Sequence, residues 1–370
     1  MPFPRLLDDS IDVSIVAGEQ RISADSHMTE PPDLWQRLPK NMRDQAPTWA
    51  PGGRGFRMDL RAGGWDPHER LKDLAYGGVS AEVLYPTQAN KAYWVEDHAV
   101  EEACFRAYND WLIEFCSVAP HRFWGLGLIS LWDIDHAVKE LERCKRAGLR
   151  GAAIGLVPPP ELPYSSEHYE PFWTAAERLG MSVNLHINSG INAFRKSGRS
   201  GMLPDQVHKF DQQKAVGEMV AGGALERHPG LNVVIAEAGA GWLPFFAQEF
   251  DYYGTTFTGT QGTVPRRPAD YIERQVYAAF ISDRVAGQLL PTYGQDTWMW
   301  SNDYPHPACT WPQSDRSIAS DLGHLDREVR AKVICTNAAR LYNDGQLPPL
   351  PDPPSEDMQD LSAWNQEHWG

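Results

Sequence analysis

Short apolar runs alternate with longer amphipathic segments along most of the chain. The eight apolar runs lie at residues 22–27, 81–86, 123–131, 151–157, 182–187, 232–239, 277–282 and 298–303. The segments with helical periodicity lie at residues 69–76, 96–118, 134–147, 168–179, 211–227, 243–253, 284–290 and 327–342. A strand followed by a helix, eight times over, predicts an α/β fold of the (β/α)8 TIM-barrel type.

The connections between these segments favour the barrel over an open, doubly wound sheet. No Gly-rich phosphate loop follows the first run, as the doubly wound nucleotide-binding folds would require. Several of the connections that follow a strand and precede a helix are long, at residues 28–68, 158–167, 188–210 and 304–325. These insertions therefore gather at the carboxyl ends of the strands, where barrel enzymes build their active sites.

Residues 1–344 are predicted to form a single barrel domain. The last segment, 345–370, is rich in proline and acidic residues, and we interpret it as a C-terminal arm.

Composition restricts the partners of the protein. The 34 basic and 49 acidic side chains give a net charge of −15, which argues against nucleic acid or an anionic membrane as a partner and leaves a small-molecule substrate. The five cysteines form no CxxC pair, and the first residues lack the basic start and apolar run of a signal peptide, so we expect a cytoplasmic protein with reduced thiols.

Charged and imidazole side chains stand at the ends of four predicted strands. They are Asp25 and His27 in the first, His186 in the fifth, Glu237 in the sixth and Asp303 in the eighth. Residues two apart in a strand share a face, so Asp25 and His27 both point toward the predicted barrel mouth. All five side chains are therefore expected to converge.

Carboxylates brought together with little water repel one another, and a divalent cation would remove that repulsion. Mixed imidazole and carboxylate donors suit zinc, iron or manganese. Each residue alone has an ordinary explanation: Asp25 and His27 as a hydrogen-bonded pair, His186 as a core histidine, Asp303 as a helix cap, Glu237 as the partner of an arginine. Their joint occurrence at four strand ends favours a metal site.

Four segments carry a resemblance to a known family. They read ISADSHMTEPPDLW from residue 22, LHINSG from residue 185, HPGLNVVIAEAGAGWLPFF from residue 228 and MWSNDYPHPACTWPQS from residue 299. The chain resembles the type 2 branch of the amidohydrolase superfamily, which contains metal-dependent hydrolases and decarboxylases. The resemblance extends over residues 22–342.

This resemblance implies that Asp25, His27, His186 and Asp303 bind metal and that Asp303 also handles a proton. The first ligand is Asp where relatives carry His or Glu, and Glu237-Ala238-Gly239 stands where relatives often carry His-Gly-Gly. Glu237 could ligate or bridge a second ion or orient a metal-bound water, so the resemblance implies one or two ions.

Two reactions fit these residues. The first is hydrolysis of an amide, lactone, ester or thioester by a metal-activated water, on a bulky or hydrophobic substrate such as an acyl-coenzyme A. Asp303 would accept the water proton, and His208 or His306 would stabilise the developing charge or serve as a further ligand. The alternative is non-oxidative decarboxylation of an aromatic or unsaturated carboxylic acid. The additional carboxylates Asp25 and Glu237 favour hydrolysis here, while a non-catalytic binding barrel would be expected to have lost its ligands.

Substrate contacts are predicted from the segments at the mouth. Trp242 and Trp300 are candidates for an apolar pocket wall, and Arg195 for contact with an anionic group of the substrate. The alternative is that the tryptophans pack the long loops together and that Arg195 is solvated. Members of the family often form dimers or larger assemblies, so the resemblance also implies a homo-oligomer.

Overall fold

The computed structural model describes residues 10–48, 61–190, 207–256, 264–306 and 308–354. Within these residues, eight parallel strands form one sheet in the order of the chain. They are β1 (Ile22–His27), β2 (Ala81–Tyr85), β3 (Phe123–Leu128), β4 (Gly151–Ile154), β5 (Ser182–His186), β6 (Val233–Ala236), β7 (Val276–Phe280) and β8 (Trp298–Trp300). Every residue of every strand is buried, as expected for a parallel sheet covered on both faces.

Main-chain hydrogen bonds join the last strand to the first. The Asp303 N–H donates to the Asp25 carbonyl over 3.0 Å, and the His27 N–H donates to the Tyr304 carbonyl over 2.6 Å. The sheet therefore closes into a barrel, and the predicted (β/α)8 fold is confirmed. This closure also brings residues from the two ends of the domain into contact.

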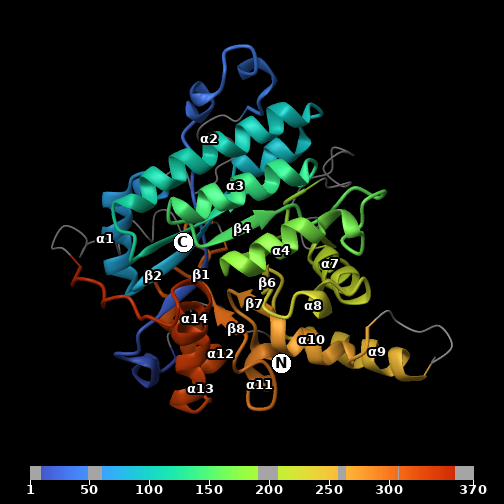
Figure 1. Ribbon diagram of the computed structural model, residues 1–370. Helices are drawn as coiled ribbons and strands as arrows, with labels where there is room; N and C mark the ends of the chain where they lie inside the picture. The colour runs from blue at the N-terminus through green and yellow to red at the C-terminus, as the bar shows by residue number, and fades with distance from the viewer. Residues whose placement is uncertain (1–9, 49–60, 191–206, 257–263, 307, 355–370) are drawn as a thin grey trace.

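Helices surround the strands on the outside of the barrel (Figure 1). Those in the described residues are α1 (Pro67–Gly77), α2 (His98–Ser117), α3 (Ile134–Arg146), α4 (Glu170–Leu179), α7 (Lys209–Ala221), α8 (Ala224–Arg227), α9 (Leu243–Thr256), α10 (Pro268–Gln275), α11 (Arg284–Leu289), α12 (Ser314–Leu322), α13 (Arg327–Ala331) and α14 (Asn337–Tyr342). A π-helical turn at Lys332–Thr336 connects α13 to α14.

The structure differs from the predicted helices at three places besides the π-helical turn within residues 327–342. The segment 211–227 is two helices, α7 and α8, because Gly223 between them has a φ of 77°, outside the helical region. Helix α12 occupies part of the predicted loop 304–325, and α10 was not predicted at all. Both are short, and hydrophobic periodicity is a weak signal over eight or nine residues.

The arm that follows α14 lies against the main body of the chain. Arg122, just before β3, donates hydrogen bonds to the carbonyls of Pro349 and Leu350, and the Gln20 side chain donates to Pro348 over 2.7 Å. The part of the predicted arm after residue 354 lies outside the described residues.

None of the described helices combines the length and the apolar character needed to cross a bilayer.

Close packing between α11 and α12 leads to a stability prediction. A Cβ atom on Gly287 would lie 2.2 Å from the main-chain oxygen of Asp321, so we expect Gly287→Ala to lower the free energy of unfolding by about 1–3 kcal/mol. A Cβ on Gly254 in α9 would have only ordinary contacts, the nearest at 3.7 Å, and Gly254→Ala is expected to add about 0.5–1 kcal/mol. Urea unfolding measures both, and equal effects from the two substitutions would contradict the packing seen here.

Candidate active site

Five side chains from four strands meet at the carboxyl-terminal rim of the barrel. Asp25 and His27 belong to β1, and His186 is the last residue of β5. Glu237 follows β6 directly, and Asp303 lies three residues after β8. The barrel thus brings together the five residues that the sequence analysis proposed as metal ligands.

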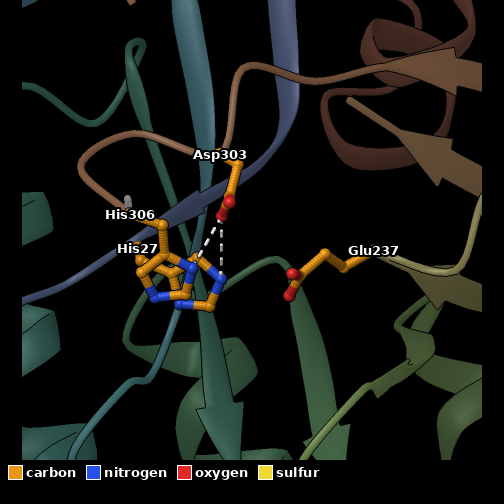
Figure 2. Close-up of side chains that lie close together, drawn as sticks. All are labelled: His27, Glu237, Asp303 and His306. Atoms are coloured by element: carbon orange, nitrogen blue, oxygen red, sulfur yellow. Dashed lines mark ion pairs between the residues drawn. The ribbon is translucent and has the colours of Figure 1, made fainter. Parts of the chain in front are cut away.

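The nitrogen and oxygen atoms of these side chains point at one another. His27 Nε2 lies 3.0 Å from His186 Nε2, 3.5 Å from Asp25 Oδ1 and 3.6 Å from Asp303 Oδ1. His186 Nε2 lies 3.7 Å from Asp25 Oδ1 and 3.3 Å from Glu237 Oε2. Figure 2 shows the side chains of His27, Asp303 and Glu237 turned toward a common centre from three directions.

These distances fit a divalent cation. Donor atoms about 2.0–2.2 Å from a metal lie roughly 3.0–3.5 Å from one another. Asp25 is completely buried, and neither of its carboxylate oxygens accepts a hydrogen bond from the described residues. A buried carboxylate in that condition is costly unless a positive charge compensates it. Among the described residues, two groups have metal-binding geometry: Asp25, His27 and His186; and His27, Glu237, Asp303 and His306.

The pKa shifts of the cluster also indicate that a positive charge is needed to compensate its carboxylates. Burial raises the pKa of Asp25 well above its ordinary value, and the charges of Asp303 and Glu237 raise it further. Burial also lowers the pKa of His27 well below its usual range and lowers the pKa of His186 to about 3. Both imidazoles are therefore neutral at physiological pH, which is the form that binds a metal.

Carbonyl groups fix the orientation of both imidazoles. His27 Nδ1 lies 3.2 Å from the Pro86 carbonyl, and His186 Nδ1 lies 2.7 Å from the carbonyl of Ile187. A carbonyl only accepts hydrogen bonds, so each Nδ1 carries the proton. Each Nε2 is left with its lone pair toward the cluster, as a metal ligand requires.

Unusual backbone geometry aims the two acidic residues that follow strands. Glu237 has a φ of 61° and Asp303 a φ of 57°, both in the left-handed region that non-glycine residues seldom occupy. Strand β6 ends directly before Glu237 and β8 ends three residues before Asp303, so both strands are shorter than the predicted segments 232–239 and 298–303. Strained backbone of this kind concentrates at functional sites. The sequence placed these acids inside strands because an apolar run does not show where φ changes sign.

His306 belongs to the site, whereas His208 lies in neither metal-binding group. The His306 ring stacks on His27 with centroids 3.7 Å apart, and its Nδ1 lies 2.9 Å from Asp303 Oδ1. Burial alone would lower the pKa of His306, but the charges of Asp303 and Glu237 outweigh burial and raise it. His208 precedes α7, where its Nδ1 lies 2.9 Å from Asp211 Oδ2, and among the described residues it is not part of either group.

Of the three residues predicted to contact substrate, the two that the structure describes lie in different surroundings. Trp300, in β8, is 1% exposed and belongs to the hydrophobic core. Trp242 is half-buried and packs edge-on against Phe246, with ring centroids 5.5 Å apart. Arg195 lies outside the described residues.

Two neighbours of the cluster were not singled out from the sequence. The Thr87 hydroxyl lies 3.1 Å from His27 Nδ1 and 3.4 Å from His306 Nε2. Glu30 is buried and accepts hydrogen bonds from the main chain that begins at Thr87. Glu30 stands in the first resembling segment, so its position close to His27 was a usable signal; a single threonine after a strand offers none.

Comparison with known proteins gives a match over most of the chain. The model of a family described as Amidohydrolase matches residues 24–343. The gamma-resorcylate decarboxylase of Rhodococcus jostii is 28% identical over 262 residues, which cover 64% of this chain and 75% of that protein.

Solved structures share the fold. An amidohydrolase from Mycobacterium avium subsp. paratuberculosis superposes with a TM-score of 0.74 at 19% identity, covering 88% of this chain and 99% of that one. A 5-carboxyvanillate decarboxylase from Novosphingobium aromaticivorans, with bound manganese, gives a TM-score of 0.69 at 17% identity, covering 88% and 97%.

The comparisons contradict the hydrolase that the sequence analysis placed first. Relatives that are 28% identical to this chain include gamma-resorcylate decarboxylases and a 2-amino-3-carboxymuconate-6-semialdehyde decarboxylase of Dictyostelium discoideum. The preference for hydrolysis rested on the extra carboxylates Asp25 and Glu237. That reasoning was wrong because carboxylates around a cation hold it equally well for either reaction and do not select the bond that breaks.

The charge repulsion at Asp25 generates a pH prediction for protein treated with a chelator. A carboxyl group whose pKa is raised by folding holds its proton to higher pH than in the unfolded chain, so it destabilises the fold as pH rises above its unfolded pKa. We expect Asp25→Asn to raise the melting temperature of chelated protein, by an increment that grows as the pH rises above about 4, the ordinary pKa of an aspartate. Calorimetry at several pH values measures this increment, and an increment that shrinks with pH would contradict the electrostatic account.

Proposed function

The chain belongs to the amidohydrolase family, and from this premise we propose that it is a metal-dependent, non-oxidative decarboxylase of an aromatic or unsaturated carboxylic acid. The observation that carries the proposal is the buried cluster of two imidazoles and three carboxylates at the barrel rim. Relatives that are 28% identical to the chain are decarboxylases, which supports this reaction over hydrolysis.

We propose a single divalent cation held by Asp25, His27, His186 and Asp303, with Glu237 as a further oxygen donor. His27 is common to both metal-binding groups, and one Nε2 lone pair binds one cation, so the two groups describe one site. Manganese, present in three of the similar solved structures, is the ion to test first, before zinc and iron. When bound, the cation supplies the positive charge that draws the substrate carboxylate and an adjacent oxygen into the site.

The residues of the chain then supply the proton that the reaction consumes. The bond between the ring carbon and the carboxyl carbon breaks, carbon dioxide leaves, and the electron pair stays on the ring carbon. A proton must take the place of the carboxyl group on that carbon. We assign its delivery to Asp303, which is fully buried and whose Oδ1 lies 3.6 Å from His27 Nε2 in the cluster.

His306 is placed to resupply that proton. Its Nδ1 is 2.9 Å from Asp303 Oδ1, close enough for direct transfer. The His306 side chain is 17% exposed, whereas Asp303 is 0% exposed, so His306 connects the buried acid to solvent. Each turnover takes up one proton from solvent along this route.

The proposed reaction can be tested on purified protein loaded with manganese. We expect carbon dioxide release from benzoates with a hydroxyl beside the carboxyl, such as 2,6-dihydroxybenzoate, and none from the same benzoates after chelation. Benzoates that lack the hydroxyl are the control, since they offer one oxygen fewer to the cation. Release of acid or thiol from esters and thioesters, without carbon dioxide from any carboxylic acid, would contradict the proposal.

The role of Asp303 predicts a specific kinetic loss. Asp303→Asn keeps an oxygen donor but cannot deliver a proton, so we expect kcat to fall by at least about 100-fold while the protein still binds manganese. Asp133→Asn is the matched control, because Asp133 belongs to neither metal-binding group and its side chain caps α3, a role that asparagine fills equally well. Wild-type turnover in Asp303→Asn would remove this residue from the proton pathway.

A further inference from the structure

A buried carboxylate close to the metal ligands has no part in the proposed chemistry. Glu30 lies three residues after His27 and is 1% exposed. Its Oε1 accepts hydrogen bonds from the N–H groups of Thr87 at 2.9 Å and Ala89 at 3.2 Å, and its Oε2 accepts one from Gln88 at 2.8 Å. Three consecutive main-chain donors thus surround one side chain, in the segment that directly follows β2.

Among the described residues Glu30 forms no ion pair at contact distance, although its charge helps to raise the pKa of His306. Burial raises the pKa of its carboxyl, and the N–H groups of Gln88 and Thr87 oppose that rise. Hydrogen bonds from N–H groups to a carboxylate are charge-assisted and roughly twice as strong as neutral ones. The interaction therefore ties the segment after β2 firmly to the chain that leaves β1.

The segment held by Glu30 is the one that contacts the His27 imidazole. The Pro86 carbonyl and the Thr87 hydroxyl lie 3.2 Å and 3.1 Å from His27 Nδ1, the nitrogen that faces away from the cluster. The same hydroxyl lies 3.4 Å from His306 Nε2, so Thr87 contacts the imidazoles of both His27 and His306. These contacts set the tautomer and the rotation of His27, and hence the direction of its Nε2.

We infer that Glu30 is a positioning residue, which acts through Pro86 and Thr87 to hold the His27 imidazole with Nε2 directed at the other metal ligands. The connection runs in a closed ring: from His27 along the main chain to Glu30, across to the Thr87 N–H, and back through Pro86 and Thr87 to His27 Nδ1. This inference rests on the metal site of the proposed function but not on which bond of the substrate breaks.

The test is the manganese affinity of Glu30→Gln, measured by calorimetry without substrate. The amide group places a donor against a main-chain N–H donor, so the segment 87–89 should shift and release the His27 ring. We expect a loss of affinity of about 10–100-fold, the range found when the groups that orient metal ligands are removed. Nitrogen NMR should also show that His27 loses its fixed Nδ1–H tautomer, a change that a general loss of stability would not produce.

Glu177→Gln is the matched control. Glu177 also accepts a hydrogen bond from a main-chain N–H, that of Gly230 at 2.6 Å, but Gly230 precedes β6 and so lies at the opposite end of the barrel from the site. Its replacement should leave manganese affinity unchanged. A folded Glu30→Gln variant with wild-type affinity and an intact Nδ1–H signal would overturn the inference.

If Glu30→Gln does not fold, a second pair of variants tests whether the segment held by Glu30 orients His27. Thr87→Val removes the hydroxyl that contacts His27, and Thr87→Ser keeps it. We expect the valine variant to lose about 10-fold in affinity and the serine variant to keep wild-type affinity. Equal affinities in both would overturn the inference. Wild-type protein that binds manganese but releases no carbon dioxide would contradict the proposed function alone, because none of these affinities involves the substrate.

Discussion

The burial of like charges at one point is the constraint on which the site depends. Asp25 and Asp303 are both completely buried, and Glu237 adds a third acid, 15% exposed in its side chain. In a medium of low polarity these carboxylates repel one another, and burial together with the charges of Asp303 and Glu237 raises the pKa of Asp25, so the arrangement is costly unless a positive charge compensates it. The imidazoles of His27 and His186 cannot provide that charge, because burial lowers both pKa values and keeps both rings neutral. A divalent cation compensates the carboxylates and uses the imidazole lone pairs at once.

A buried polar network behind the ligands keeps them in place. Arg70 in α1 pairs with Glu82 over 2.6 Å and donates a hydrogen bond to the His27 carbonyl over 2.9 Å. On the same side, the Ser26 hydroxyl donates to the Asn302 side chain over 3.0 Å, which connects β1 to the segment before Asp303. Networks of this kind are costly when partly satisfied and rigid when most members are paired. The same buried network therefore holds both Asp25 and His27 in β1 and Asp303 after β8, where the last strand of the barrel meets the first.

The site also explains why residue chemistry alone did not identify the reaction. A cation beside a proton-transferring acid can activate water against a carbonyl or hold a carboxylate while carbon dioxide leaves. In our proposal both reactions would use the same atoms of Asp303 and the same metal ligands. What distinguishes them is the substrate that the mouth admits, and that depends on loop residues around the site rather than on the ligand set.

The sequence determined the barrel, because eight alternations of strand and helix patterns leave few other ways to bury so many apolar runs. It also determined which polar residues stand at strand ends, since charge in an apolar run is visible without a structure. It could not reveal the left-handed backbone at Glu237 and Asp303, the division of α7 from α8, or the contact of Glu30 with the chain after β2. These features arise where segments distant in sequence meet, and the cost of strained backbone or a buried carboxylate is offset only by contacts that exist after the barrel has closed.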